Sequence, residues 1–355
     1  MNVKRIVGAL LAALVLILAA AVVYLGITPS TAQFRDQHGT LLANSVAVLE
    51  RVELGGMKQW ILMRGEDASN PVLLWLHGGP GSAQMSLAHH LDGALEDEFV
   101  VVHWDQRGAG KSNPSDFDET RMTFEQFVSD ARELTRYLQE RFEAERIFLL
   151  GHSWGSQLGL TLVDRYPEDY HAYISVSQVV DNVRAVEVAH DWLSREVARS
   201  GDQGSLGKLE EIGAPPYTHS EYRAFAQLVI DFGGNLDVGL WRLALIALRA
   251  PEYTIVDYVR LLGGMNRGGA PMQEEGSIPS VNYLEGVPAV DVPVYFFIGE
   301  NDYNTPLALV EEYFEVIEAP HKALVVFEGA AHTPFLKAPE VFNAEVVRVK
   351  AQTLR

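Results

Sequence analysis

The stretch from Arg146 to Leu160, RIFLLGHSWGSQLGL, constrains the fold of this chain more than any other. Its apolar residues 147–150 predict a buried strand, and the small residues that follow the serine predict a helix. Between them stands the pattern G-x-S-x-G, formed by Gly151, Ser153 and Gly155. A sharp turn packed between strand and helix leaves no room for a Cβ atom at the glycine positions. The helix would aim its N-terminal N–H groups at an anion formed beside Ser153, so we interpret Ser153 as a nucleophile rather than as part of a plain turn.

Strands and helices alternate on both sides of this turn. Short apolar runs predict further strands at 72–76, 99–104, 173–176, 294–298 and 323–327. Residues 45–53 and 58–63, joined at Gly55-Gly56, predict an antiparallel hairpin. Apolar positions at helical spacing after Thr123 predict a helix that ends near Phe142. The order predicts an α/β fold with a mostly parallel sheet and helices on both faces.

The strand-and-helix pattern breaks in the middle of the chain. Residues 179–291 are helical and aromatic in character, and we interpret them as a helical cap inserted between two strands. The expected organisation is therefore an N-terminal segment (1–28), a first part of the core (29–178), the cap (179–291) and a second part of the core (292–355).

The N-terminal segment contains 22 consecutive apolar or glycine residues, Ile6 to Ile27, preceded by Lys4 and Arg5. A helix of this length measures about 33 Å, enough to cross a hydrocarbon core of about 30 Å. The run exceeds the apolar region of a cleavable signal peptide, so we expect a single-pass transmembrane anchor, with cleavage within 1–32 as the alternative. In both cases the basic residues stay in the cytoplasm, and the rest of the chain lies outside it.

Composition excludes several classes of partner and site. The formal net charge of −19 opposes binding to nucleic acid or to an anionic lipid surface. The chain has no cysteine, which excludes disulfides, thiol catalysis and cysteine-ligated zinc, and it has no H-E-x-x-H motif. We therefore expect neither a metal nor another cofactor.

A serine hydroxyl needs a base to take its proton and a third group to orient that base. In α/β hydrolases these groups follow the serine in the order acid, then histidine. Asp302 comes after the strand predicted at 294–298 and is our choice for the acid, with Glu300 as the alternative. His332 comes after the strand predicted at 323–327 and is our choice for the base. His152 adjoins the nucleophile, and we expect its side chain to point away.

Acyl transfer also needs donors for the oxyanion that forms on the carbonyl oxygen. The backbone N–H of Trp154, directly after the nucleophile, is the first expected donor. The second is expected in the turn His77-Gly78-Gly79-Pro80-Gly81, with Gly79 as the candidate.

Three motifs in this order constitute a resemblance. H-G-G-P-G at 77–81, D-Q-R-G-x-G-x-S at 105–112 and G-x-S-W-G-S at 151–156 look like those of the proline iminopeptidase (prolyl aminopeptidase) family of α/β hydrolases. The resemblance covers roughly residues 45–178 and 292–355. It implies a serine hydrolase with an α/β-hydrolase fold that removes an N-terminal residue, often proline, from short peptides, with cap carboxylates holding the substrate amine. Asp105 and Arg107 are assigned to loop scaffolding.

The chain departs from that family at two places. His152 stands where many members have glycine, and the cap lacks the W-x-x-W-E motif whose glutamate contacts the amine. Four cap residues could replace that glutamate, and the sequence does not choose among them: Glu187, Glu196, Glu211 and Glu252.

Three hypotheses for function remain after these observations. The first is an aminopeptidase that acts on short peptides outside the cytoplasm. The second keeps the same machinery for a small ester, as in a carboxylesterase or lactonase with an apolar cap pocket. The third is a non-catalytic binding protein on the same fold. An epoxide hydrolase or dehalogenase would need a carboxylate nucleophile, and Ser153 stands at that position.

Overall fold

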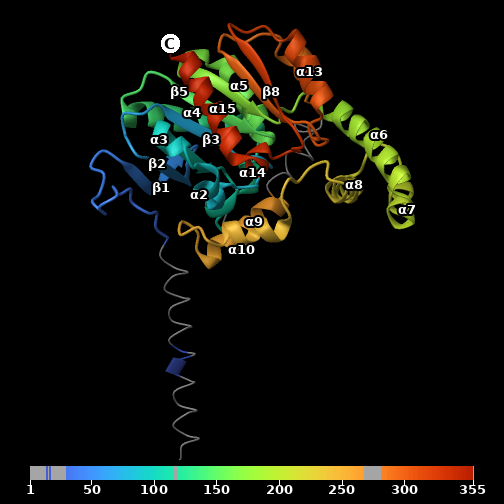
Figure 1. Cartoon of the computed structure of the whole chain (residues 1–355), viewed down its shortest axis with the longest axis horizontal. Coiled ribbons are helices and arrows are strands. Elements are labelled where there is room, and N and C mark those ends of the chain that lie inside the picture. Colours follow the sequence, from blue (N-terminus) through green and yellow to red (C-terminus); the bar gives the residue numbers. More distant parts are fainter. Residues whose placement is uncertain (1–12, 15, 17–28, 116–117, 268–280, 355) are drawn as a thin grey trace, which may run out of the picture.

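The computed structural model describes residues 13–14, 16, 29–115, 118–267 and 281–354. Its centre is one eight-stranded sheet with the strand order β1-β2-β4-β3-β5-β6-β7-β8 (Figure 1). Only β1 with β2 and β2 with β4 pair antiparallel, and all other neighbours are parallel. The strands are β1 (Val46–Leu54), β2 (Met57–Gly65), β3 (Val72–Leu76), β4 (Val100–Asp105), β5 (Ile147–His152), β6 (Tyr170–Val176), β7 (Val294–Gly299) and β8 (Lys322–Phe327). The predicted mostly parallel sheet and the hairpin at Gly55-Gly56 are confirmed.

Two layers of helices cover the sheet because its central strands are apolar on both faces. Alternate residues of β3 show this: Leu74 and Leu76 pack in one apolar cluster, whereas Leu73 and Trp75 pack in another. The first cluster includes residues of α4 (Phe124–Phe142), α5 (Trp154–Arg165) and α13 (Leu307–Val316). The second includes residues of α2 (Ala88–Leu91), α3 (Leu95–Glu98), α14 (Pro334–Lys337) and α15 (Pro339–Thr353). Helices on both faces are thus confirmed.

Between β6 and β7 the described residues form helices and add no strand to the sheet. The helices are α6 (Asn182–Ser200), α7 (Gln203–Ile212), α8 (His219–Asp231), α9 (Leu240–Ala247), α10 (Ile255–Arg267) and α12 (Tyr283–Gly286). Helices α6, α7 and α8 share an apolar cluster of their own, which includes Trp192, Leu209 and Phe225. Figure 1 shows α6 to α8 extending to one side of the sheet, while α9 and α10 lie below it.

No helix within the described ranges combines the length and the apolar character needed to cross a bilayer. The expected anchor, residues 1–28, lies outside the described residues apart from 13, 14 and 16.

A buried ion pair holds the loop after β4 against α4. The Arg107 guanidinium lies 2.8 Å from the Asp130 carboxylate, and the two side chains are 2% and 0% exposed. Arg107 also donates to the carbonyl of Gly55, which fixes the β1–β2 turn. Burial raises the pKa of Asp130, although Arg107 and Gln59 oppose the rise. The Asp130 carboxylate therefore depends on Arg107 as its charge partner. Arg107 itself contacts α4 and the β1–β2 turn, as expected for a residue that supports the loop.

Replacing Arg107 should destabilise the fold strongly. Arg107→Ala leaves the Asp130 carboxylate buried without its charge partner, and we expect a loss of about 3–5 kcal/mol in the free energy of unfolding. Urea unfolding followed by circular dichroism measures the loss. The matched control is Arg165→Ala, which removes the exposed ion pair with Glu125 and should cost less than about 1 kcal/mol. Equal losses in the two variants would contradict the role given to the buried pair.

Candidate active site

Ser153 stands at the turn where β5 ends and α5 begins. β5 ends at His152 and α5 begins at Trp154, so Ser153 alone forms the junction. Its backbone has φ +54° and ψ −118°, a conformation that residues with a side chain rarely adopt. The Ser153 N–H donates to the carbonyl of Val176 on β6 at 3.0 Å, and the Ser153 carbonyl accepts from the Ser156 N–H at 2.8 Å. These two bonds hold the strained turn in place.

The two glycines beside Ser153 are required by backbone contacts. A Cβ atom on Gly151 would lie 2.3 Å from the carbonyl oxygen of Gly155. A Cβ atom on Gly155 would lie 2.2 Å from the carbonyl oxygen of Leu76, on β3. Because both obstacles are backbone atoms, no side-chain movement can relieve them. The close packing of α5 on the sheet therefore requires glycine at both positions of the G-x-S-x-G pattern.

Asp302 and His332 meet at the same edge of the sheet. Asp302 follows β7 and His332 follows β8, and they are 1% and 6% exposed. The Nδ1 atom of His332 lies 2.8 Å from Oδ2 of Asp302. The structure thus brings together the two residues chosen from the sequence. Glu300, the alternative acid, instead accepts the N–H of Gly329 at 2.9 Å.

The surroundings of Asp302 keep its carboxylate ionised. Burial alone would raise the pKa of Asp302, but the charge and hydrogen bond of His332 and the bonds from Thr305 hold that pKa below its usual value. Oδ1 accepts the N–H groups of Asn304 and Thr305 at 2.9 and 2.8 Å, and Oδ2 accepts the Thr305 hydroxyl at 2.7 Å. An ionised Asp302 keeps the proton of His332 on Nδ1 and leaves Nε2 free to accept one.

Asn304 contacts the nitrogen of His332 that a base would use. Its amide nitrogen lies 3.1 Å from Nε2 of His332. Since Nδ1 donates to Asp302, Nε2 is the acceptor of this bond. The Asn304 amide must therefore turn aside when a hydroxyl donates its proton to Nε2.

His152 does not point away from the site, and that expectation is wrong. Its ring lies 4.9 Å from the ring of His332, centroid to centroid, and its Nε2 donates to the backbone carbonyl of His332 at 2.9 Å. The hydroxyl of Ser177 donates to the same carbonyl at 3.0 Å. Burial, together with the neighbouring His332, lowers the pKa of His152 to about 3, so its ring is neutral and brings no charge beside His332.

A short segment between α8 and α9 binds the loop that carries Asp302 and the loop that carries His332. We call this segment, residues 234–237, the clamp. The carbonyl of Gly234 accepts the N–H of Tyr303 at 2.8 Å, and the carbonyl of Asn235 accepts the N–H of His332 at 3.0 Å. The Asp237 carboxylate accepts the N–H groups of Ala331 and Thr333 at 2.7 and 2.8 Å, and the Thr333 hydroxyl at 3.0 Å. The clamp fixes the residues on either side of His332.

The turn after β3 lies beside Ser153. Gly79 has φ +120°, and a Cβ atom on Gly78 would lie 3.2 Å from the Cβ atom of Ser153. The ring of His77 supports the turn, because its Nε2 accepts the N–H of Gln106 at 3.1 Å. Within the described residues, no protein acceptor is bonded to the N–H of Gly79 or to that of Trp154. The role of these two N–H groups as oxyanion donors stays a prediction.

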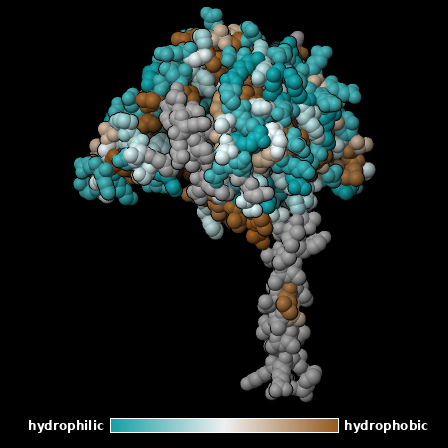
Figure 2. Space-filling model, turned by 180° about the vertical axis from the view of Figure 1, so that it is seen from behind, coloured by the Kyte–Doolittle hydropathy of each residue, from teal (hydrophilic) through white to brown (hydrophobic). Residues whose placement is uncertain are grey.

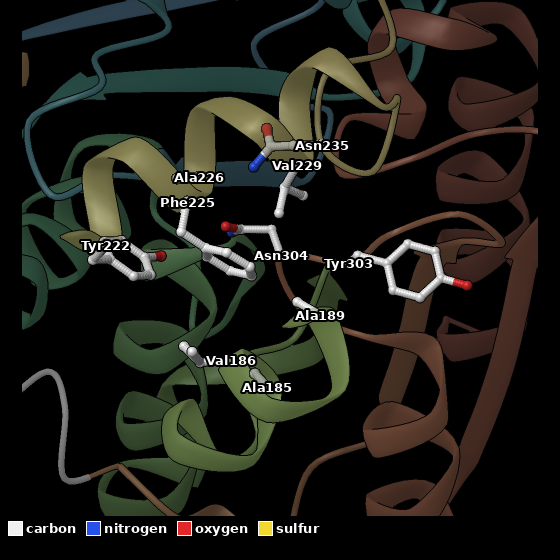
Figure 3. A pocket seen from close by; sticks show the side chains of 10 residues that line it. All are labelled: Ala185, Val186, Ala189, Tyr222, Phe225, Ala226, Val229, Asn235, Tyr303 and Asn304. Atoms are coloured by element: carbon white, nitrogen blue, oxygen red, sulfur yellow. The ribbon is translucent and has the colours of Figure 1, made fainter. Parts of the chain in front are cut away.

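A pocket beside Asn304 lies between α6 and α8 (Figure 3). Figure 3 shows the side chains of Asn235 and Asn304 reaching into the space between the two helices, with the ring of Phe225 next to them. Its lining residues are Ala185, Val186, Ala189, Tyr222, Phe225, Ala226, Val229, Asn235, Tyr303 and Asn304. The walls are mostly apolar, the phenol of Tyr303 points away from the space, and the cavity measures about 20 Å³.

The cap carboxylates considered from the sequence lie elsewhere. None of Glu187, Glu196, Glu211 and Glu252 is among the described residues that line the pocket. Glu252 is buried against His89, with Oε1 2.8 Å from Nε2 of that histidine. Glu196 pairs with Arg199 at 2.6 Å. None of the four glutamates therefore faces the pocket between α6 and α8.

The sequence did not single out Asn304 or Asp237. Asn304 lies two residues after Asp302, in a loop rich in turn-forming residues. No feature of the sequence there predicts a contact between Asn304 and His332. Asp237 reaches its partners across 94 and 96 residues, a contact that no local pattern reports.

Comparison with known proteins gives a consistent result. The chain matches the Alpha/beta hydrolase family over residues 73–345. It is 33% identical over 305 residues to the probable aminopeptidase YbaC of Bacillus subtilis (strain 168), covering 84% of this chain and 94% of that one. It is 25% identical over 296 residues to the proline iminopeptidase of Lactobacillus delbrueckii subsp. lactis, covering 80% and 91%.

A solved structure shows the same fold. The crystal structure of the proline iminopeptidase of Mycobacterium smegmatis aligns with a TM-score of 0.61 at 21% identity, covering 86% of this chain and 98% of that one. The resemblance stated from three sequence motifs is thereby confirmed. The family match and the relative at 33% identity show that this chain belongs to the alpha/beta hydrolase family and is a hydrolase.

Proposed function

We propose that this hydrolase uses Ser153 as its nucleophile and forms an acyl-enzyme. The observation that carries the proposal is the 2.8 Å contact between His332 and Asp302, placed at the sheet edge where the strained turn presents Ser153. The Ser153 hydroxyl transfers its proton to Nε2 of His332 as its oxygen attacks the substrate carbonyl. The ionised Asp302 holds the imidazole through Nδ1 and stabilises the imidazolium that forms.

The oxyanion of the tetrahedral intermediate is assigned to the N–H groups of Gly79 and Trp154. Each such donor contributes about 3–4 kcal/mol to the stability of the transition state in acyl transfer. His332 then returns its proton to the leaving group, and the acyl-enzyme is hydrolysed when His332 activates a water in the same way.

The proposed substrate is a short peptide, from which the enzyme releases the N-terminal residue. The names of the similar proteins, aminopeptidase and proline iminopeptidase, support this class. We further propose that residues 179–291 form a cap over a core of residues 29–178 and 292–355. The length of the apolar run at Ile6 to Ile27 supports a membrane anchor, with the catalytic part outside the cytoplasm.

A carboxylesterase or lactonase is the second candidate, and one observation favours it. The lining of the pocket between α6 and α8 contains no carboxylate among the described residues. A substrate ammonium group needs an opposite charge to compensate for its lost hydration, whereas an uncharged ester does not.

A substrate panel tests the proposed function. Proline and other aminoacyl arylamides are compared with short-chain aryl esters, using the full chain and its Ser153→Ala variant. We expect arylamide cleavage by the wild type and a loss of about 10⁶-fold in kcat in the variant, which lacks the nucleophile. Rapid ester turnover without arylamide cleavage would support the esterase. Unchanged activity in the Ser153→Ala variant would show that Ser153 is not the nucleophile.

The choice of Asp302 as the acid is tested against Glu300. Asp302→Asn keeps the shape of the side chain but cannot hold the same proton arrangement on His332, and we expect kcat to fall about 10⁴-fold. Glu300→Gln keeps an oxygen that can accept from the Gly329 N–H and should change kcat by less than about threefold. A large loss of kcat in Glu300→Gln together with a small change in Asp302→Asn would show that Glu300, and not Asp302, is the acid.

The clamp should matter for turnover more than for folding. Asp237→Ala removes three hydrogen bonds to the residues flanking His332, and a base displaced by about 1 Å can cost about 10²-fold in rate. We expect kcat to fall by about that factor while KM changes little. The control is Asp231→Ala on α8, where the exposed side chain accepts only from Gln227. Equal kcat values in the two variants would show that the clamp does not position His332.

A further inference from the structure

Helices α9 and α10 expose apolar side chains along their outward faces. Nine of the seventeen exposed large hydrophobic side chains of the described chain fall within residues 240–265, so they form a cluster and are not scattered. Trp241 is 77% exposed and Val259 68%. Figure 2 shows this apolar surface gathered at the lower edge of the globular part. We call it the α9–α10 face, and it consists of Leu240, Trp241, Leu245, Leu248, Ile255, Val256, Val259, Leu262 and Met265.

The inward faces of both helices already have partners. Leu243 and Ile246 of α9 pack on the cluster that contains Trp75 and Phe342. Tyr258 and Leu261 of α10 pack against the cluster around Leu62 and Met85. A helix that is apolar on all sides is normally buried on all sides. The outward faces therefore have the composition of a buried surface while they lie exposed.

The charges around the α9–α10 face differ from those of the whole chain. The formal net charge is −19, yet residues 240–265 contain only two acidic residues, and both are buried. Glu252 pairs with His89, and Asp257 pairs with Lys111 at 2.6 Å. Arg242 and Arg249 are exposed beside the apolar side chains. The pattern of tryptophan, aliphatic residues and arginine is typical of surfaces that lie in a membrane interface.

The first described residues after the N-terminal apolar run lie next to this face. The N–H of Ser30 donates to the carbonyl of Pro251, in the connection between α9 and α10, at 3.0 Å. Arg64 secures the following residues, because its Nη1 donates to the Thr31 hydroxyl at 2.6 Å and to the Ala32 carbonyl at 2.7 Å. The apolar run in the sequence, Ile6 to Ile27, ends three residues before Ser30.

We propose that the α9–α10 face docks on the surface of a lipid bilayer, the same bilayer that the N-terminal run enters. The length of the run favours lipid over the run itself as the occupant. As a helix it would measure about 33 Å, which matches a hydrocarbon core, whereas the eight residues of α9 measure about 12 Å. A run that crosses the bilayer next to Pro251 brings the α9–α10 face to the lipid surface, where its side chains enter the interface.

The test uses the absence of cysteine in the chain, which makes one introduced cysteine the sole labelling site. Val259→Cys on α10 and Val341→Cys on α15 are each labelled with an environment-sensitive fluorophore in the full-length protein. Val341 is the matched control, since it is 56% exposed and lies on a helix that packs on the sheet. The proteins are reconstituted into phosphatidylcholine vesicles, because the negative net charge opposes an anionic surface.

We expect brominated phosphatidylcholine to quench the label at position 259 at least about threefold more than the label at position 341. Reduction of the label by aqueous dithionite should be slower at position 259 by a similar factor. Both labelled variants should unfold at the temperature of the wild type, since both positions are exposed.

Three results would overturn the proposal. Equal quenching and equal dithionite reduction at both positions would show that the α9–α10 face remains in water. Protection from dithionite at 259 without quenching by brominated lipid would show that protein covers the face, either the N-terminal run or a second copy of the chain. Failure of the full-length protein to float with the vesicles would show that it does not bind a lipid bilayer.

Discussion

The site depends on one close contact between backbones. Gly155 of α5 lies so near the carbonyl of Leu76 that a Cβ atom would come within 2.2 Å of it. The contact sets α5 directly on β3, and the chain continues from Leu76 into the turn that carries Gly79. The proposed nucleophile Ser153 and the turn that carries the proposed oxyanion donor Gly79 therefore lie side by side, since a Cβ atom on Gly78 would lie 3.2 Å from that of Ser153. A larger residue at position 155 would separate the two.

The parallel sheet explains why most of the candidate site could be predicted from the sequence. Gly79, Ser153, Asp302 and His332 each follow a strand, and β3, β5, β7 and β8 are parallel, so their carboxyl ends share one edge. Short apolar runs locate such strands well. The roles of His152, Asn304 and Asp237 could not be predicted in the same way. Their contacts depend on how loops lie over that edge, and the sequence has no periodic pattern for such contacts.

The inserted helices thus do more than enclose a pocket. The clamp accepts hydrogen bonds from Tyr303, which follows Asp302, and from His332 itself. The relative position of Asp302 and His332 is therefore set by the core strands on one side and by the inserted segment on the other. This arrangement accounts for the carboxylate of Asp237, because three donors from one loop need a strong acceptor when the loop is partly buried.

The position of α9 connects the outer surface of the protein to its site. Only Val238 and Gly239 separate Asp237, which holds the residues beside His332, from Leu240, where α9 and its exposed face begin. Val238 is 8% exposed and packs with Phe335 in one cluster, so this link is short and firmly packed. The clamp also borders the α6–α8 pocket, because Asn235 lines it. The outer face of α9 is therefore joined by a connection of only two residues to the clamp that holds the loop of the proposed base.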